Sequence, residues 1–216
     1  MQNINSTITQ VQYQAFQKAY DFFNVQLFAG VLPNVLVTLQ RQAKAYGYFS
    51  PERFIWRAGE EVTPELAMNP DHFGRTDNEI LSTLVHEMCH LWQHAHGTPP
   101  RKSYHDREWA AKMKEVGLFP SHTGEPGGKE TGQHVTHYII ADGAFAASFA
   151  RLRSAGFALR WQSRVDEGGQ RKKAASKTKY TCPNCGRNAW AKPDSELICG
   201  GCYDKGEGEI YIMEAA

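Results

Sequence analysis

Residues 76–97 read TDNEILSTLVHEMCHLWQHAHG, a stretch that has the features of one complete helix. Thr76 suits the N-cap position, and Glu79 three residues later completes a capping-box pattern. Gly97 suits the position just after the helix, and two prolines follow it closely. At about 100° per residue, the apolar side chains fall on one face and the polar ones on the other. The stretch therefore predicts a helix that buries one side and presents the other to a site.

The polar face of this helix carries an H-E-x-x-H motif, formed by His86, Glu87 and His90. Residues four apart lie one above the other on a helix, so the two histidines can bind one metal ion. Glu87 lies about a quarter turn from His86, within reach of a water molecule on that metal. Two imidazoles on the metal and a carboxylate on its water are the layout of a zinc hydrolase. A bare motif also arises by chance, so the prediction depends equally on the cap, the apolar face and a histidine downstream.

A catalytic zinc ion binds three protein ligands and keeps one position for water, so the motif needs a third ligand. His105 is the preferred candidate, because it starts a second predicted helix that can fold back against the first. His96 occupies the last position of the longer H-E-x-x-H-x-x-G-x-x-H pattern, but that pattern requires a glycine where this chain has Gln93. The alternatives that stay open are His96, a carboxylate from Glu108 or Glu115, or no third protein ligand.

Three further histidines are weaker candidates for the third ligand. His94 lies one turn beyond His90, too far along the axis of a straight helix. His134 and His137 are distant from the motif in the sequence. They are therefore kept only as competitors of His105.

Four of the five cysteines form two C-x-x-C pairs near the C-terminus, at Cys182, Cys185, Cys199 and Cys202. Two such pairs with a short β segment between them are typical of a closed, tetrahedral, structural zinc site. Iron in a rubredoxin-like site is the chemical alternative. The first residues lack a cationic segment followed by an apolar run, so an intracellular chain with zinc-bound thiolates is expected rather than disulfides.

The length of 216 residues suits one domain of ordinary size with a small module. Hydrophobic residues make up 41% and charged residues 22%, which predicts a packed core. The periodicity predicts helices over 9–29, 76–97, 105–116 and 144–155. It predicts strands over 35–39, 65–69, 134–140 and 157–162, and a hairpin over 46–56 that turns at Ser50-Pro51.

The net charge of +1 conceals a strongly basic band. Residues 151–180 contain nine lysines and arginines against two acidic residues, whereas the blocks on either side are mildly acidic. Such a band can contact nucleic-acid phosphates. A solvated linker is the alternative interpretation.

The H-E-M-x-H sequence and His105, followed by Glu108 and Trp109, resemble the SprT-like metallopeptidases, the family that includes Spartan. The similarity extends downstream, because bacterial members end in a zinc ribbon. Upstream it includes residues by which the family enters its fold: Phe23, Asn24, Phe28, Gly30, Leu32, Tyr46 and Gly47.

The resemblance implies an α+β fold, with a zincin-like core of helices around a small mixed sheet and a small C-terminal β zinc ribbon. It implies His86, His90 and His105 as zinc ligands and Glu87 as the catalytic acid and base. The expected domains are a metallopeptidase domain over 1–165, a basic flexible linker over 166–179 and a four-cysteine zinc ribbon over 180–216.

The predicted function is that of a zinc-dependent endopeptidase acting on DNA-associated or DNA-crosslinked proteins, with the zinc-bound water activated by Glu87. The alternative is a nucleic-acid-binding adaptor whose zincin-like core has little or no protease turnover. Two zinc ions are expected, one catalytic and one structural. The expected partners are protein substrates and single-stranded or junction DNA, bound through the linker and through Trp190, Lys192 and Tyr203 of the ribbon. No membrane partner is expected; we expect a monomer in the cytoplasm, associated with the nucleoid in a bacterium.

Overall fold

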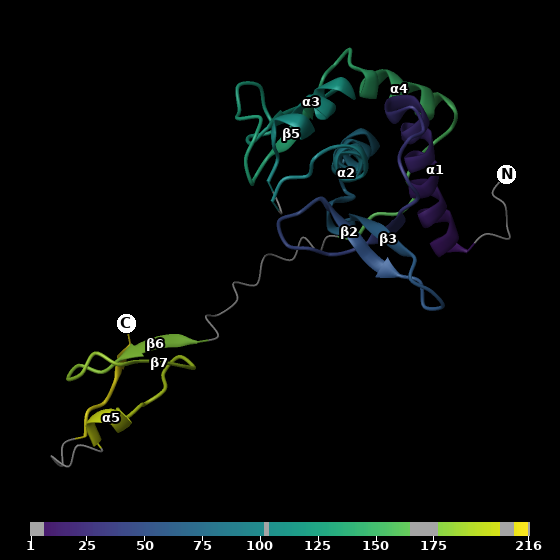
Figure 1. Cartoon of the computed structure of the whole chain (residues 1–216). Helices are drawn as coiled ribbons and strands as arrows, with labels where there is room; N and C mark the ends of the chain where they lie inside the picture. Colours follow the sequence, from purple (N-terminus) through teal and green to yellow (C-terminus); the bar gives the residue numbers. More distant parts are fainter. Residues whose placement is uncertain (1–6, 102–103, 165–176, 204–209, 216) are drawn as a thin grey trace. The chain divides into compact units, whose positions relative to one another are not determined.

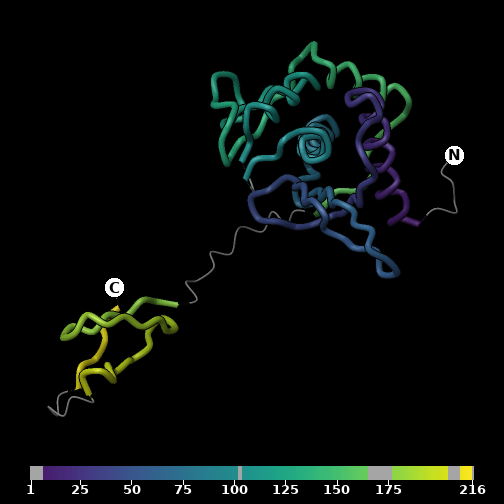
Figure 2. The backbone as a smooth tube through the Cα atoms, in the orientation of Figure 1, coloured from purple at the N-terminus to yellow at the C-terminus, as the bar shows by residue number. Residues whose placement is uncertain are grey.

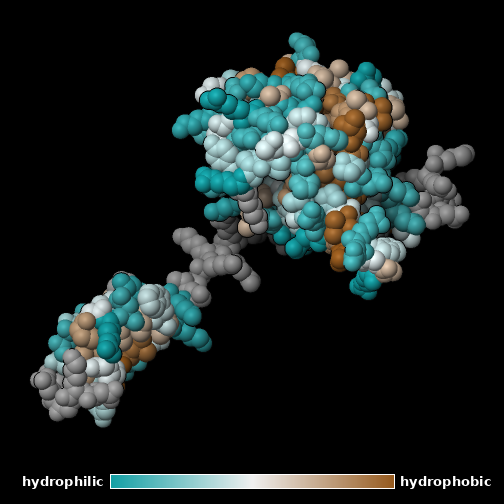
Figure 3. All heavy atoms as spheres, in the orientation of Figure 1, coloured by the Kyte–Doolittle hydropathy of each residue, from teal (hydrophilic) through white to brown (hydrophobic). Residues whose placement is uncertain are grey.

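The computed structural model describes residues 7–101, 104–164, 177–203 and 210–215. The chain divides into two compact units, Met1–Val165 and Asp166–Ala216 (Figure 1). Among the described residues, no helix combines the length and the apolar character needed to cross a membrane. The face drawn in the space-filling view is largely hydrophilic, with scattered apolar patches (Figure 3).

The helices of the first unit surround the one that carries the H-E-x-x-H motif. The motif helix is α2 (Asp77–His96). Around it lie α1 (Ile8–Phe28), α3 (Arg107–Glu115) and α4 (Ala144–Ser154), and a short 3-10 turn is formed by Pro70–His72. Helix α2 lies in the middle, in contact with α1, α3 and the main sheet (Figures 1 and 2). It is buried on most sides, which places its motif next to the core rather than on an outer surface.

The core of this unit is formed by aromatic and aliphatic side chains from all four helices and the main sheet. Phe23 of α1 stacks on Phe145 of α4 with ring centroids 5.5 Å apart, and both are fully buried. Burial of such a side chain contributes roughly 1.5–3 kcal/mol of transfer free energy. These contacts hold α4 against α1, which in turn packs on α2.

The main sheet has the order β1-β3-β2, with β1 (Leu36–Leu39) parallel and β2 (Gly47–Ile55) antiparallel to the central β3 (Val62–Met68). The predicted turn at Ser50-Pro51 is wrong. Strand β2 continues through these residues, and its register with β3 shifts between Ser50 and Phe54, where Glu52 has a φ of 50°. Because β2 is an edge strand, it accommodates a bulge and a proline that donates no hydrogen bond. The hairpin turns instead at residues 56–61.

A second, two-stranded sheet pairs β4 (Leu118–Ser121) with β5 (Thr136–Ile139) in antiparallel fashion. Strand β5 lies inside the predicted strand 134–140, whereas β4 is not among the predicted elements. The predicted strand 157–162 is wrong, because this described segment pairs with no other strand. Its apolar residues Phe157 and Leu159 pack on the helical core instead.

The second unit contains a three-stranded sheet of order β7-β6-β8, formed by β6 (Thr178–Thr181), β7 (Asn188–Ala191) and β8 (Glu214–Ala215), and the short helix α5 (Gly200–Tyr203). Its small core consists of Tyr180, Met213 and three of the four paired cysteines. Strand β6 begins at Thr178, within the predicted linker 166–179. The linker residues 166–176 lie outside the described part of the chain.

Candidate metal centres

Helix α2 forms with the predicted N-terminal cap. The Glu79 backbone N–H donates to Thr76 Oγ1 at 3.3 Å, and the Thr76 backbone N–H donates to Glu79 Oε2 at 2.9 Å. At the other end Gly97 is extended, with a φ of −116°, and not left-handed as the helix-stop pattern implies. The site is tight, since an added Cβ would lie 2.5 Å from Glu108 Oε2 and would force that carboxylate to move. The local signals therefore place both ends of the helix correctly, but the glycine has a tertiary role.

The structure brings His86 and His90 of α2 together with His105. One nitrogen atom from each ring can be chosen so that all three lie within 4.8 Å of one another. His105 precedes α3 instead of starting it, because Asp106 is the N-cap and accepts a hydrogen bond from Trp109 N at 3.0 Å. The position of His105 thus comes from an extended segment, which corrects the prediction that it begins the second helix.

A two-way backbone bridge with Gly132 holds His105 in place. His105 N donates to Gly132 O at 2.8 Å, and Gly132 N donates to His105 O at 3.0 Å. The same carbonyl lies 3.1 Å from His105 Nδ1. Since a carbonyl only accepts, Nδ1 carries the proton and Nε2 keeps its lone pair for a metal ion.

Trp109 of α3 lies against all three imidazoles. Its ring centroid is 4.9 Å from that of His86, 5.1 Å from that of His90 and 4.3 Å from that of His105. The indole is fully buried and nearly parallel to the His90 ring. It therefore restricts the orientations of the three rings and excludes water from one side of them.

Burial also controls the protonation of the cluster. Desolvation lowers the pKa of His90 to about 3 and the pKa values of His86 and His105 below their ordinary range, and the neighbouring imidazoles act in the same direction on His86 and His90. All three rings are thus neutral near pH 7 and have lone pairs available. Three neutral nitrogen donors that lie within 4.8 Å of one another are compatible with a zinc ion.

Glu87 is a buried carboxyl group beside this cluster, with Oε1 4.0 Å from His86 Nε2. Burial raises its pKa to about 8, while a hydrogen bond from the Phe49 backbone acts in the opposite direction. Strand β2 passes close to it, since a Cβ added to Gly47 would lie 3.4 Å from Glu87 Cγ and 2.8 Å from Ala67 O. A carboxyl with a pKa near neutrality, next to a candidate metal site, is suited to accept and return a proton.

The other candidates for the third ligand lie outside the cluster. Glu108 Oε2 accepts hydrogen bonds from Gln93 Nε2 at 2.9 Å and from Thr98 N at 2.8 Å. Glu115 pairs with Lys112 at 2.7 Å, and His96 Nε2 lies 3.0 Å from the carbonyl of Val31. These side chains therefore have structural partners of their own.

His137 of β5 is close to the cluster but in a different role from the one considered in the sequence. Its Nδ1 lies 3.1 Å from His86 Nδ1, and its Nε2 lies 2.9 Å from Ser82 Oγ. Desolvation lowers its pKa to about 4. No local pattern connects His137 with His86 across 51 positions, so sequence reasoning had no signal for this contact.

The second unit brings its four cysteines together, with Sγ atoms within 4.8 Å of one another. All four are free thiols, and the closest cross-pair distances are 3.5 Å for Cys185–Cys199 and 3.8 Å for Cys182–Cys202. Gly186 forms the turn after the first pair with a φ of 69°, and its N–H donates to the Cys182 carbonyl at 3.0 Å. Hydrogen bonds from the Arg187 backbone and from the other thiols lower the pKa of Cys185 to about 7, whereas burial raises the pKa of Cys202, so Cys185 has more thiolate character than Cys202.

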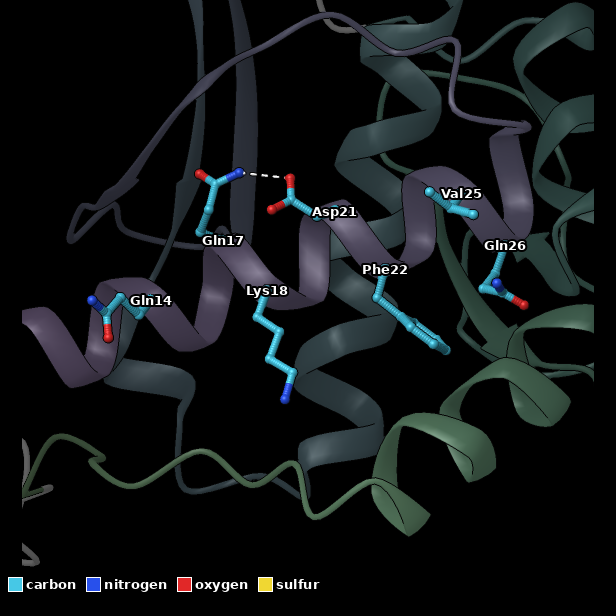
Figure 4. A pocket seen from close by; sticks show the side chains of 7 residues that line it. All are labelled: Gln14, Gln17, Lys18, Asp21, Phe22, Val25 and Gln26. Carbon is cyan, nitrogen blue, oxygen red and sulfur yellow. Dashed lines mark hydrogen bonds between the residues drawn. The ribbon is translucent and has the colours of Figure 1, made fainter. Parts of the chain in front are cut away.

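A shallow groove lies elsewhere on the described surface, along the outer face of α1. It has a volume of about 590 Å³ and is lined by Gln14, Gln17, Lys18, Asp21, Phe22, Val25 and Gln26 (Figure 4). Gln17 Nε2 donates to Asp21 at 2.8 Å, and the lining contains no histidine or cysteine (Figure 4). The groove therefore has none of the histidine or cysteine side chains that form the two candidate metal centres.

Comparison with known proteins agrees with this geometry. An uncharacterized protein in the mucB 3' region of Salmonella typhimurium is 46% identical to the chain over 54 residues, which are 25% of this chain and 73% of that protein. No solved structure matches the chain. The model of the SprT-like family matches residues 16–130, which include the complete histidine cluster. The chain belongs to the SprT-like family.

Proposed function

We propose that this protein is a zinc-dependent endopeptidase in which His86, His90 and His105 bind the metal and Glu87 is the catalytic acid and base. The observation that supports this most strongly is the convergence of three neutral imidazoles beside a buried carboxyl group, in a chain of the SprT-like family. The zincin-like character of the core belongs to the same proposal, since two ligands and the acid come from one helix and the third ligand follows it.

A bound zinc ion would polarise the scissile carbonyl group and make water more acidic. Glu87 accepts a proton from the attacking water and returns it to the nitrogen of the leaving amine. Its raised pKa means that the metal-free site holds it largely protonated at pH 7. A metal ion bound by the neutral histidines would add positive charge, which would favour the ionised form of Glu87, so metal loading and base function are coupled.

Strand β2 is the element that we propose for substrate binding. It lies at the edge of the main sheet, and its residue Gly47 packs against the side chain of Glu87. An extended peptide can add to such an edge by main-chain hydrogen bonds. Pairing with β2 would bring the scissile bond close to Glu87.

We propose DNA-associated proteins as the substrates, with the second unit as the DNA-contacting part and a four-cysteine zinc site as its structural centre. Trp190 and Tyr203 are 61% and 62% exposed, although they are large aromatic residues. Lys179 of β6 is paired with Trp190 of β7 in register, so a cation and an aromatic ring are adjacent on the sheet. Bases stack on exposed aromatic rings while lysines contact phosphates, which suits single-stranded DNA.

The deciding experiment measures zinc content and cleavage of histone or casein with and without single-stranded DNA. We expect two zinc ions per wild-type chain and DNA-stimulated cleavage. Glu87→Gln should keep two zinc ions and lose cleavage, and His86→Ala should keep one zinc ion and lose cleavage. Equal cleavage by wild type and Glu87→Gln would refute the proposed mechanism. DNA binding with one zinc ion and no cleavage by the wild type would favour the non-proteolytic adaptor instead.

A further inference from the structure

We propose that His137 is a positioning residue, which holds His86 in the one tautomer and ring orientation that directs its Nε2 at the metal site. The inference rests on the proposed function, because it takes His86 to be a zinc ligand. It assigns a role to a residue of β5, which lies outside both the H-E-x-x-H helix and the segment that carries His105.

The hydrogen bonds behind His86 form a chain with a single direction. Ser82 Oγ lies 2.9 Å from the Glu79 carbonyl, which can only accept, so the Ser82 hydroxyl donates to it. The Ser82 oxygen is then free to accept from His137 Nε2 at 2.9 Å. A neutral His137 that is protonated at Nε2 has its lone pair at Nδ1.

That lone pair lies 3.1 Å from His86 Nδ1 and accepts its proton. A neutral His86 that is protonated at Nδ1 has its remaining lone pair at Nε2, the nitrogen needed at the metal site. The proton positions thus follow from the backbone carbonyl at the end of the chain. With His137 protonated at Nε2, a neutral His86 protonated at Nε2 would place the two Nδ1 lone pairs against each other.

Both ring nitrogens of His137 take part in this series of hydrogen bonds, so neither nitrogen is available to a substrate or a metal ion. Its ring centroid is 5.2 Å from that of His86, with an angle of 41° between the ring planes. A metal-binding histidine commonly donates its second N–H to a carboxylate, a carbonyl group or water. His105 uses the Gly132 carbonyl in this way, whereas His86 uses a neutral imidazole, which orients it without adding negative charge.

The test uses three substitutions that separate the two ring nitrogens of His137. His137→Asn keeps an acceptor close to the Nδ1 position. His137→Leu has a side chain of a size similar to that of histidine but no acceptor. His137→Gln keeps a polar group near the Nε2 position, where it can still reach Ser82. Gln133→Leu is the matched control, since Gln133 is exposed and near the same strand.

The first readout is zinc affinity of the full-length chain, measured by competition with a chromophoric chelator. Cobalt substitution distinguishes the two sites, because only the four-cysteine site gives thiolate-to-cobalt charge-transfer absorption. We expect His137→Leu and His137→Gln to weaken binding at the histidine site by about 10- to 100-fold. His137→Asn and Gln133→Leu should stay within a few-fold of wild type, and the cysteine site should be unchanged in all four.

The second readout is the tautomer of His86 in the metal-free protein, observed by nitrogen-15 NMR of the imidazole. We expect Nδ1–H in wild type and His137→Asn, and a mixture in His137→Leu and His137→Gln. Unchanged zinc affinity in His137→Leu, or an equal loss in all three His137 variants, would overturn the positioning role. If His137→Leu fails to fold, the Asn and Gln variants decide the question. If His86→Ala binds as much zinc as wild type, the proposed metal site itself is wrong, which is a separate outcome.

Discussion

Gln93 Nε2 donates a hydrogen bond of 2.9 Å to Glu108 Oε2, and this contact joins the helix that carries two cluster histidines to the helix that follows the third. The same amide nitrogen donates to Asp106 Oδ1 at 2.9 Å, next to His105 in the chain. Gln93 is almost completely buried. The residue that excludes the longer H-E-x-x-H-x-x-G-x-x-H pattern therefore links the two segments that present the histidines.

Substitution of Gln93 by leucine should destabilise the first unit by about 1–3 kcal/mol, because two carboxylates lose a shared donor in a buried place. Zinc affinity at the histidine site should fall as well, because a displacement of Asp106 would also displace the adjacent His105. Chemical denaturation and zinc competition measure the two effects. Gln14→Leu on the exposed face of α1 is the control and should change stability by less than about 0.5 kcal/mol. Unaltered stability of Gln93→Leu would contradict the linking role.

The metal-free protein should lose stability as the pH rises through the range set by Glu87. Its pKa is about 8 in the folded state, above the ordinary value of 4.5, so the folded state binds more protons than the unfolded state between these values. Stability therefore declines from about pH 4.5 to about pH 8, by up to about 5 kcal/mol. Glu87→Gln should remove this decline. The measurement is denaturation in a chelator at pH 5, 7 and 9, followed by helical circular dichroism, and parallel curves for the two proteins would contradict it.

The cluster histidines should act in the opposite direction on acidification. Their folded-state pKa values lie below 6.5, with His90 at about 3, so the unfolded state binds more protons between these values. Their contribution is present above about pH 6.5 and is lost as the pH falls towards 3. His90→Gln should reduce this acid sensitivity in the metal-free protein. Acid titration of both proteins, monitored by circular dichroism, tests the expectation, and identical midpoints would count against it.

Gly47→Ala should disturb the packing between β2 and α2. The added methyl group would lie 2.8 Å from the Ala67 carbonyl and 3.3 Å from Thr83 Cγ2, besides its contact with the Glu87 side chain. Overpacking of this kind costs about 1–3 kcal/mol, and cleavage should fall because Glu87 is displaced. Gly74→Ala is the control, since its Cβ would meet no atom within 4 Å. Equal effects of the two substitutions would show that the close approach at Gly47 is unimportant.

Trp190→Ala should weaken binding of single-stranded DNA by about 1–3 kcal/mol, because a stacking surface is lost. Trp161→Ala in the first unit is the matched control, as Trp161 is 50% exposed. Fluorescence anisotropy with a labelled oligonucleotide at several salt concentrations measures the change. Affinity that is equal in the two variants would place the DNA-binding surface elsewhere.

The features that could be predicted from the sequence depend on residues close together in the chain. The ends of α2, the pairing of His86 with His90, and the two C-x-x-C pairs follow from capping chemistry, helical spacing and ligand type. The mixed α/β character and the membership in the SprT-like family follow from the same local patterns. Short-range geometry is nearly the same in any fold that contains these segments, so it can be inferred before the fold is known.

Other features depend on contacts between distant segments. The path of β2 through Ser50 and Pro51 depends on its place at the sheet edge, and the extended segment at His105 depends on its bridge to Gly132. The contact of His137 with His86 requires β5 to pack behind α2. Each of these arrangements is stabilised by a partner many residues away, and propensity and spacing carry no information about which partner that is.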